Sequence, residues 1–350
     1  MSIRPAFSPA VLAIDPARAA ERIEASIRAS LFQELRRKGA VVGLSGGIDS
    51  SVVAALCVRA LGKERVRGLF MPEADSSEDS LRLGRHLADF LGIGTALEDI
   101  TPILAGARCY ERRDEAIRKV VPEYGEGWKC KIVLPNLLEG SAYALFSVVV
   151  RSPAGAEKCV RLTAEAYLGV VAATNFKQRA RMLVEYYHAD RLNYAVVGTP
   201  NRLEYDQGFF VKHGDGAADL KPIAHLYKTQ VYQLAKYLDI PAEIQERPPT
   251  TDTYSLPQSQ EEFYFALPYD KMDLCLYAVN EGLPAAELAA AIGLTVEQAE
   301  RAYRLIESKR SATRYLHLPP LMVEEAGEEP RRAADSPAAE NALEDLWTSA

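Results

Sequence analysis

AVVGLSGGIDSS, residues 40–51, is the stretch that decides the fold. Residues 40–44 are apolar or glycine throughout, which is typical of a short strand buried on both faces of a parallel sheet. Residues 51–61 are expected to form the next helix, and Gly62 ends it. Between strand and helix, Gly46 and Gly47 let the backbone turn tightly and approach an anion. The stretch therefore predicts a strand, an anion-binding loop and a helix in direct succession.

The loop has the chemistry of a phosphate cradle. Helix-start N–H groups and serine hydroxyls are the donors that face a bound anion at such a position. No Gly-Lys-Ser/Thr closes the loop, so it is not a Walker loop, and the Asp49 carboxylate would repel a phosphate unless a divalent cation lay between them. Asp49 therefore implies Mg²⁺. The plainer alternative is that the serines and the aspartate only cap the helix. The predicted phosphate-binding residues are Ser45, Gly46, Gly47, Asp49, Ser50 and Ser51.

Strands and helices alternate outward from this loop. Asp15 and Pro16 begin a helix that precedes the first strand. Further strands are expected at residues 66–71, 95–100 and 194–198, and further helices at residues 78–91, 175–189 and 227–238. This alternation predicts an α/β fold, in which a doubly wound, mostly parallel sheet carries helices on both faces. A capping box at Thr295 and Gln298 begins another helix, so the C-terminal region is expected to be helical.

The alternation is interrupted at residues 101–170. A charged stretch at residues 111–119 is followed by apolar runs at 130–134, 142–150 and 159–162, which predict an inserted, β-rich hairpin or small meander. An isolated ribbon is marginal in water, so we expect the insertion to pack near a subunit interface or the mouth of the cleft. The alternative is a peripheral decoration. The chain thus divides into an N-terminal helical segment at residues 1–39, a large domain at 40–322 and an acidic mobile tail at 323–350.

Composition excludes several classes of protein. The 350 residues include 41 Lys and Arg against 48 Asp and Glu, and eight of these acids lie in residues 323–350. The rest of the chain is therefore nearly neutral, unlike a protein that binds nucleic acid. Five widely spaced cysteines form no zinc motif and indicate reduced thiols in a cytoplasmic protein. Neither a signal-peptide pattern nor an apolar run of about 20 residues is present, so we expect neither secretion nor a membrane segment.

The sequence resembles a known family at several separate motifs. SGGIDSS after an apolar strand is similar to the pyrophosphate loop of the adenine nucleotide α-hydrolase-like enzymes, which cleave ATP between its α and β phosphates, and Met71-Pro72 is similar to a second feature of that superfamily. These residues alone leave GMP synthesis, asparagine synthesis, tRNA lysidine formation and sulfur insertion into tRNA open. Residues 196–230, VVGTPNRLEYDQGFFVKHGDGAADLKPIAHLYKTQ, closely resemble NAD synthetase, as do NFKQRARM at 175–182, RPPT at 247–250 and SKR at 308–310.

This resemblance covers about residues 17–100 and 171–315 and implies an activity. Members of the family use ATP as a co-substrate to adenylylate the nicotinate carboxylate of deamido-NAD, release pyrophosphate and let ammonia displace AMP, which gives NAD. They typically work as homodimers, with the dinucleotide bound across the interface. Residues 40–322 would form the ATP pyrophosphatase-type synthetase domain. Members that use glutamine carry a preceding nitrilase-like domain with its own catalytic Cys; residues 1–39 contain no Cys, so ammonia is the expected nitrogen source.

The resemblance also implies roles for single residues. Glu204 would be a second Mg²⁺ ligand beside Asp49. Asp219 is a candidate catalytic residue, because it could orient the incoming ammonium or accept its proton. Loop capping or plain surface exposure is the alternative for each. The implied ATP contacts are Thr199, Lys228 and Thr250, and the implied deamido-NAD contacts are Arg179, Lys212, Asp219 and Lys309.

Two departures from the family pattern bear on the substrate. Ser308 stands where the family has His, and the insertion at residues 101–170 is longer than usual. Amidation of a related carboxylate, such as nicotinate mononucleotide, therefore stays open. So does a tRNA-modifying enzyme or a nucleotide sensor that keeps the pyrophosphate loop. The nearly neutral body argues against tRNA, and the joint presence of Asp49, Glu204 and Lys228 argues against a sensor without ligase chemistry.

Overall fold

The computed structural model describes residues 7–134, 146–251, 253–265 and 267–323. By compactness the chain forms one unit at Met1–Leu316 and a second at His317–Ala350. All the helices and strands on which the site depends belong to the first unit. Apart from Val323, the predicted acidic tail at residues 323–350 lies outside the described residues. The sequence-based division of the chain at residues 39 and 322 stays a prediction.

A parallel sheet of four strands lies at the centre of this unit. The strands are β1 (Ala40–Gly43), β2 (Val66–Phe70), β3 (Gly94–Leu97) and β7 (Ala195–Val196), in the order β3-β2-β1-β7. Successive residues of a strand point to opposite faces. Ala40 and Val42 accordingly join the hydrophobic core beneath α1, α2, α3 and α8, whereas Val41 packs with the α6 side. The predicted doubly wound α/β fold is confirmed, although β3 and β7 are shorter than expected.

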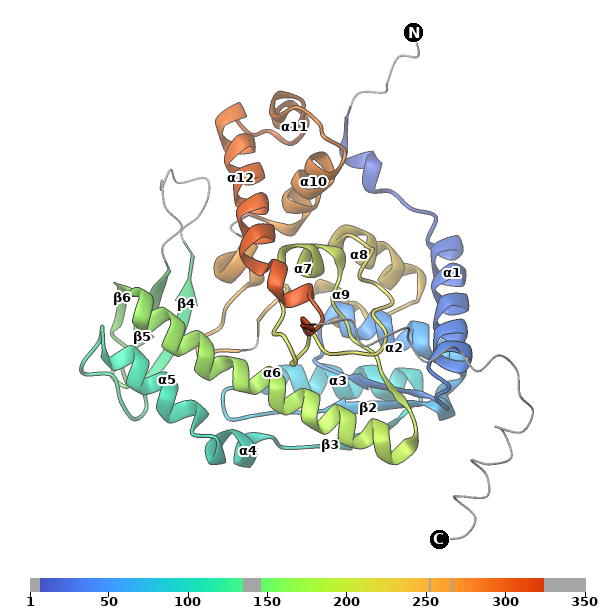
Figure 1. Cartoon of the computed structure of the whole chain (residues 1–350), viewed down its shortest axis with the longest axis horizontal. Coiled ribbons are helices and arrows are strands. Elements are labelled where there is room, and N and C mark those ends of the chain that lie inside the picture. The colour runs from blue at the N-terminus through green and yellow to red at the C-terminus, as the bar shows by residue number, and fades with distance from the viewer. Residues whose placement is uncertain (1–6, 135–145, 252, 266, 324–350) are drawn as a thin grey trace. The chain divides into compact units, whose positions relative to one another are not determined.

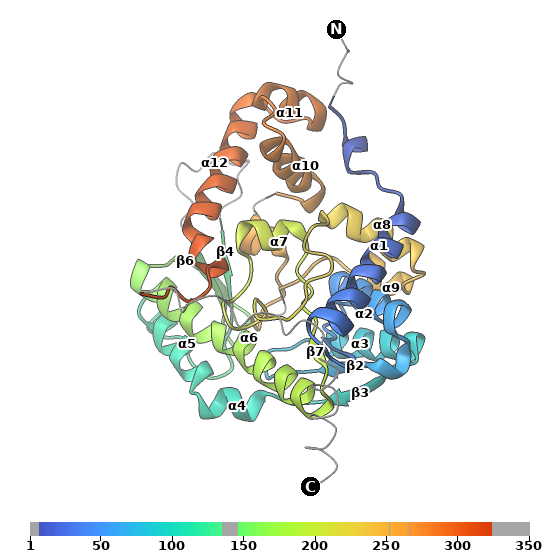
Figure 2. The same cartoon turned by 45° about the vertical axis from the view of Figure 1, so that its right-hand side comes forward.

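The helices that flank the sheet begin where local capping allows. Asp15 accepts a hydrogen bond from the Arg18 N–H (3.1 Å) and caps α1 (Pro16–Ala29), which packs beside α2 (Figure 1, Figure 2). Helix α2 (Ile48–Leu61) begins three residues earlier than predicted, because Gly47 is its extended N-cap. Asp49 therefore lies in the first turn of a helix and not in the loop. Helices α3 (Glu78–Leu91) and α8 (Lys228–Tyr237) match their predicted ranges.

The region of residues 101–170 is more helical than the sequence analysis predicted. It begins with α4 (Thr101–Gly106) and α5 (Cys109–Arg118), so the charged stretch at 111–119 belongs mostly to a helix. A three-stranded antiparallel meander follows, formed by β4 (Lys129–Val133), β5 (Ser147–Arg151) and β6 (Glu157–Arg161) in that order. The prediction of a small β meander is thus confirmed. Residues 135–145, which include the start of the apolar run at 142–150, lie outside the described residues.

Helix α6 (Ala164–Leu192) is far longer than the predicted helix at 175–189. Thr163 caps it by accepting a hydrogen bond from the Ala166 N–H (3.2 Å). Its first turns pack Ala166 and Val170 into the core of the meander and α5, and α5 lies alongside α6 in both views (Figure 1, Figure 2). This tertiary contact favours a helix at the start of α6, whereas the sequence pattern placed residues up to 170 in the inserted β-rich region.

The C-terminal part of the first unit is helical, as predicted. Helices α10 (Tyr269–Asn280), α11 (Ala285–Ile292) and α12 (Val296–Thr313) share a hydrophobic core of their own and lie together at the top of Figure 1. The predicted capping box of Thr295 and Gln298 is present at the start of α12. Short α7 (Arg202–Gln207) and α9 (Ala242–Glu246) complete the α-helices named here. The shorter helical turns are Pro9–Leu12, Ser30–Glu34, Lys63–Arg65, Glu261–Phe265 and Arg314–His317.

Candidate active site

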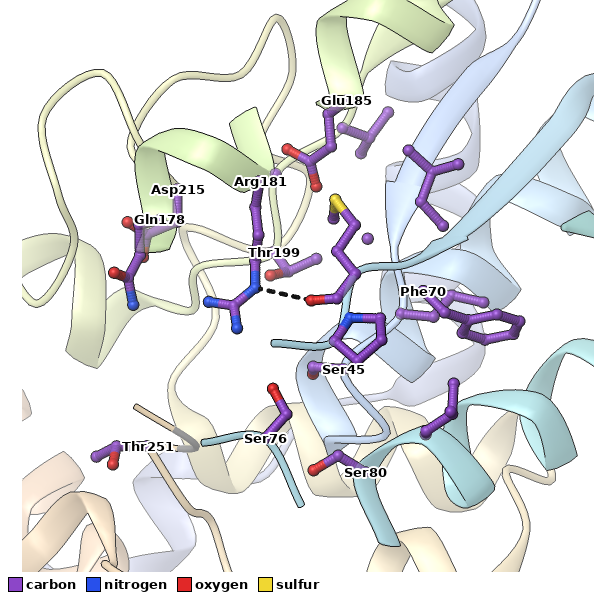
Figure 3. Close-up of a pocket in the computed structure, with 18 of the residues that line it drawn as sticks. Ser45, Phe70, Ser76, Ser80, Gln178, Arg181, Glu185, Thr199, Asp215 and Thr251 are labelled. Atoms are coloured by element: carbon purple, nitrogen blue, oxygen red, sulfur yellow. Dashed lines mark hydrogen bonds between the residues drawn. The ribbon is translucent and has the colours of Figure 1, made fainter. Parts of the chain in front are cut away.

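Two cavities meet at the carboxyl ends of β1, β2 and β7, where ligands bind in open α/β sheets. We call them the small cavity, of about 230 Å³, and the large cavity, of about 900 Å³. The small cavity is shown in Figure 3; Leu44, Leu69, Phe70 and Met71 give it apolar walls. The large cavity extends toward α12 and the meander. The two cavities share five lining residues, Ser45, Gln178, Thr199, Asp215 and Thr251.

The predicted phosphate loop is tightly folded at the junction of the cavities. Gly46 has φ +72°, and a Cβ on it would lie 2.5 Å from the Ser80 carbonyl oxygen, so only glycine fits. The Ser45 and Ser50 hydroxyls lie 3.1 Å apart, and the Ser51 hydroxyl donates to the Gly47 carbonyl (2.8 Å). Ser51 is fully buried, whereas Ser45 and Gly47 of the loop and Ile48, Asp49 and Ser50 of the first turn of α2 line the large cavity.

Beside this loop, the buried Lys228 forms a charged cluster with the half-buried Asp49 and Glu204. The Lys228 ammonium donates to the Asp49 carboxylate. Asn201 connects the two acids: its side-chain amide donates to Asp49 (3.0 Å), and its backbone N–H donates to Glu204 (3.2 Å). Gln260 also donates to Glu204, at 3.0 Å. Residues more than 150 positions apart in the sequence thus converge on the start of α2.

The charges of this cluster depend on each other. Burial, followed by repulsion from Asp49, raises the pKa of Glu204 to about 7. Burial alone would lower the pKa of Lys228, but Asp49 and Glu204 together raise it above its ordinary value. Asp273 on α10 fixes the N-terminus of α8. Its carboxylate accepts hydrogen bonds from the backbone N–H groups of Lys228 (3.3 Å) and Thr229 (2.7 Å). This contact fixes the backbone that carries the lysine.

The two carboxylates fit the predicted Mg²⁺. In nucleotide sites this ion is held by one or two carboxylates together with substrate phosphates, and not by a cage of protein ligands. Asp49 and Glu204 lie close enough for repulsion between them to disfavour the charge on Glu204. Among the described residues, no group of three His, Cys, Asp or Glu side chains could hold a metal ion alone. A site here would therefore need the phosphates of a nucleotide.

Most of the other predicted residues also line the large cavity. Thr199 lies at the junction and Thr250 at the rim of the large cavity. Arg179 donates to the Lys212 carbonyl (3.3 Å), and the Lys212 ammonium donates to the Tyr315 carbonyl (2.9 Å). Lys309 donates to the Tyr264 carbonyl.

The half-buried Lys309 ammonium packs against an aromatic ring. It lies 4.0 Å from the centre of the Tyr264 ring. Burial lowers the pKa of Lys309 to about 7. Ser308, which replaces the family's His, lines the same cavity as Lys309. Three of the four predicted dinucleotide contacts therefore line the large cavity, namely Arg179, Lys212 and Lys309. The fourth, Asp219, does not.

Asp219 occupies a different position. Its carboxylate accepts hydrogen bonds from the Val196 N–H (2.8 Å) and the Tyr186 hydroxyl (3.2 Å), so it holds its loop to the end of β7. It is not among the described residues that line either cavity. Asp215, four positions earlier, lines both. The catalytic role of Asp219 stays a prediction, and the geometry corresponds to the loop-capping alternative.

The sequence analysis missed a polar stripe on the inward face of α6. Lys177, Arg181 and Glu185 recur every four residues, so they share one face of the helix. Lys177 is fully buried and donates to Glu73 (2.9 Å), Asp75 (2.7 Å) and the Thr253 carbonyl. One turn on, Arg181 donates to the Met71 carbonyl (3.5 Å; Figure 3). Arg179 points elsewhere, as expected from its alternation with these residues.

The meander contributes to the large cavity. This agrees with the expectation that the insertion packs near a subunit interface or the mouth of the cleft, and not with the alternative of a peripheral decoration. Leu134 and Phe146 at the ends of β4 and β5 line it. The Leu134 N–H donates to the Glu262 carbonyl (3.0 Å), and the Cys130 N–H donates to the Ser255 hydroxyl (2.9 Å). The insertion thus packs on the segment that follows Thr250, at the mouth of the cleft.

The family model described as NAD synthase matches residues 19–121 and 156–314. The "NH(3)-dependent NAD(+) synthetase" of Rhizobium rhizogenes is 59% identical over 324 residues, which is 93% of this chain and 98% of that protein. The protein of the same name from Mesorhizobium japonicum is 59% identical over 319 residues, 91% of this chain and all of that protein.

Solved structures share the fold. The NH3-dependent NAD synthetase of Campylobacter jejuni is 24% identical, with a TM-score of 0.58 over 89% of this chain and all of that one. The NMN synthetase of Francisella tularensis is 23% identical, with a TM-score of 0.57 over 89% of this chain and 99% of that one. At such identity these two show the fold alone. With the family model matching most of the chain and relatives this similar over nearly their whole length, the chain belongs to the NAD synthase family.

Proposed function

We propose that the chain is an ammonia-dependent ligase that converts deamido-NAD to NAD. ATP adenylylates the nicotinate carboxylate, pyrophosphate leaves, and ammonia displaces AMP. The observation that carries the proposal is the cluster of Asp49, Glu204 and Lys228, which lies beside a phosphate loop where two cavities meet. One reactant can occupy each cavity, and their reacting groups then meet at the loop. Curated relatives with 59% identity carry the matching name.

The residues of the chain support the first step by holding charge. A carboxylate attacks the α-phosphorus only when the charge that leaves on pyrophosphate is stabilised. The N–H groups at the start of α2 and the hydroxyls of Ser45 and Ser50 are donors at the place where that charge develops. Lys228 adds a buried cation that the backbone contact of Asp273 holds in place. Asp49 and Glu204 would hold Mg²⁺, which when bound neutralises phosphate charge.

Each cavity suits one substrate. The apolar walls of the small cavity, including Phe70 and Met71, fit the purine of ATP, with Thr199 and Thr250 nearer the phosphates. The large cavity presents three basic side chains, whose cationic forms suit the phosphates and the carboxylate of a dinucleotide. Asp215, which lines both cavities, is better placed than Asp219 to meet ammonia there. The basic residues are Arg179, Lys212 and Lys309.

A homodimer is part of the same proposal. The outer face of α6 exposes Leu168, Leu183 and Tyr187, at 63%, 58% and 61% of their full areas. Apolar side chains exposed along one helix are typical of a subunit interface. Leu168 also lines the large cavity, so a second copy packed here would help to close it. Within the described residues, no helix is long and apolar enough to cross a membrane. We place the reaction in the cytoplasm, which the five free cysteines support.

The test is pyrophosphate release by the purified chain with ATP, Mg²⁺ and ammonium, comparing deamido-NAD with nicotinate mononucleotide. We expect turnover with deamido-NAD, and NAD identified by mass. Preference for the mononucleotide would move the assignment to amidation of that related carboxylate. ATP binding without turnover of either acid would favour a sensor, and pyrophosphate release that depends on tRNA would favour a tRNA-modifying enzyme. Asp49→Asn serves as the inactive control, because it keeps the volume and removes the charge.

A further inference from the structure

Glu185 is a carboxyl group on the wall of the small cavity that the mechanism above does not use. It lies on α6 and lines the small cavity, and Figure 3 shows its carboxyl group among the side chains of that cavity. A Cβ on Gly43 would lie 2.5 Å from the Glu185 Oε1 atom and 3.2 Å from the Met71 Cε atom. A side chain at residue 43 would therefore require this carboxyl group to move. Among the described residues, its oxygens have no hydrogen-bond partner.

The depth of Glu185 corresponds to the base of a nucleotide and not to its phosphates. It lies against Gly43, two residues before Ser45 of the phosphate loop, and β-strands rise about 3.3 Å per residue, which separates them by roughly 7 Å. A nucleotide whose phosphates lie at the start of α2 extends its ribose and base in this direction. The neighbouring walls, Leu69, Phe70 and Met71, are apolar, which suits an aromatic ring.

The charged groups around Glu185 leave it poised between its two protonation states. Arg181 and Tyr186 lie beside it on α6, and Asp215 faces it from the loop that leads to Asp219. On the side of the sheet, Gly43 at the end of β1 and Met71 just after β2 lie near it, and neither carries a charge. Burial raises the pKa of Glu185 to about 7, with Arg181 opposing the shift and Asp215 adding to it.

The two protonation states match different purines. A neutral carboxyl group has one donor and one acceptor, which complement a ring nitrogen of adenine and its exocyclic amino group. An ionised carboxylate only accepts, and it complements the adjacent N–H and NH₂ donors of guanine. We propose that Glu185 is a specificity-determining residue that recognises the purine of the nucleotide substrate and, in its protonated form, selects adenine over guanine. The inference rests on the proposed use of ATP.

The experiment compares ATP with GTP in the whole enzyme at two pH values. The ratio of their kcat/KM values is measured near pH 6 and near pH 8.5, because the protonation of ammonia affects both nucleotides equally and cancels in the ratio. Binding of each nucleotide with Mg²⁺, in the absence of deamido-NAD, gives a second measurement. We expect the preference of the wild type for ATP to fall at least about 10-fold as Glu185 ionises over this range.

Two variants and a control make the test specific. Glu185→Gln keeps one donor and one acceptor at every pH, so its ATP preference should not vary with pH. Glu185→Leu should lose roughly 10- to 100-fold in ATP affinity, as expected for a lost two-point contact, with KM for deamido-NAD unchanged. Glu300→Gln, on the surface of α12 and outside both cavities, should behave like the wild type.

Three outcomes would overturn the inference. The first is a wild-type ratio of kcat/KM for ATP to kcat/KM for GTP that does not change with pH. The second is normal ATP binding by Glu185→Leu. The third is an equal loss of ATP binding in Glu185→Gln and Glu185→Leu, because the ionised carboxylate would then be the form that binds ATP. Each of these would leave the proposed ligase intact if NAD is still formed from ATP. If the wild type uses no nucleotide at all, the proposed function itself fails.

Discussion

Lys177→Met should lower the free energy of unfolding by about 3 kcal/mol. The effect should be on stability, because Lys177 is not among the described residues that line the two cavities. The ammonium is fully buried and makes three hydrogen bonds, to Glu73 (2.9 Å), Asp75 (2.7 Å) and the Thr253 carbonyl (2.7 Å). Removing one partner of a buried ion pair costs about 3–5 kcal/mol, because the opposite charge stays buried. We take the low end, since the Tyr110 hydroxyl still donates to Glu73 (2.8 Å) and Arg113 still pairs with Asp75 (2.6 Å).

The assay is urea unfolding followed by circular dichroism, with two matched variants. Lys158→Met removes the cation of a surface pair with Glu123, whose side chains are 52% and 49% exposed, so the loss should be far smaller than in Lys177→Met. Glu73→Gln combined with Lys177→Met removes a buried charge together with its partner and should recover part of the lost stability. A loss below about 1 kcal/mol in Lys177→Met would refute the reasoning, because the two carboxylates would then be solvated.

The same network gives a pH dependence with a defined sign. Burial alone would raise the pKa of Asp75, but Lys177 and Arg113 lower it below its ordinary value. A carboxyl group with a lowered pKa in the folded state binds protons less readily than in the unfolded chain. Its stabilisation is therefore complete above about pH 4 and is lost as the pH falls below that range. Lys177→Met should show a smaller loss of stability than the wild type on acidification.

Three further predictions test the proposed function. Asp49→Ala should lower pyrophosphate formation more than 10-fold, a change of about 1.4 kcal/mol in the barrier, and retention of over a tenth of the wild-type rate would contradict its role. The chain should use ammonium and not glutamine, with rates that rise with pH as NH₃ replaces NH₄⁺; NAD formed from glutamine in the absence of free ammonia would be the contrary result. Light scattering should give the mass of a dimer, and Leu183→Asp should weaken the association of the two subunits. An active wild-type monomer near 38.5 kDa would rule out the interface on α6.

The strand, tight turn and helix around Ser45 were predictable because their signal is local. Apolar residues before Ser45, two glycines and a helix start occupy one short stretch, and the structure has them in this order, with the helix starting three residues earlier than predicted. The cluster of Asp49, Glu204 and Lys228 joins distant residues, and only the resemblance to a family indicated that they belong together. Asp273, which holds the backbone of Lys228, carried no signal in the sequence, because a buried acid on α10 resembles any other helical acid until its partners are known.

The region of residues 101–170 was harder to predict for a physical reason. Residues 111–119 are mostly charged, yet Arg113, Ala116 and Ile117 all turn inward on α5. Arg113 is buried because Asp75 and Asp114 neutralise it, at 2.6 and 2.9 Å. A hydrophobic pattern cannot reveal a helix whose inward face includes a buried arginine, since the partner that makes such burial tolerable lies elsewhere in the sequence.

Helix α6 carries polar residues on a face that is directed toward the sheet. Lys177, Arg181 and Glu185 occupy the helix face that meets β1 and β2, where apolar residues would be expected in a helix that only covers a sheet. Polar residues at core-facing positions cost stability unless each has a partner or a ligand. Lys177 has three partners and Arg181 has a carbonyl, but Glu185 has no hydrogen-bond partner among the described residues. Its position on a cavity wall therefore points to a ligand as the missing partner.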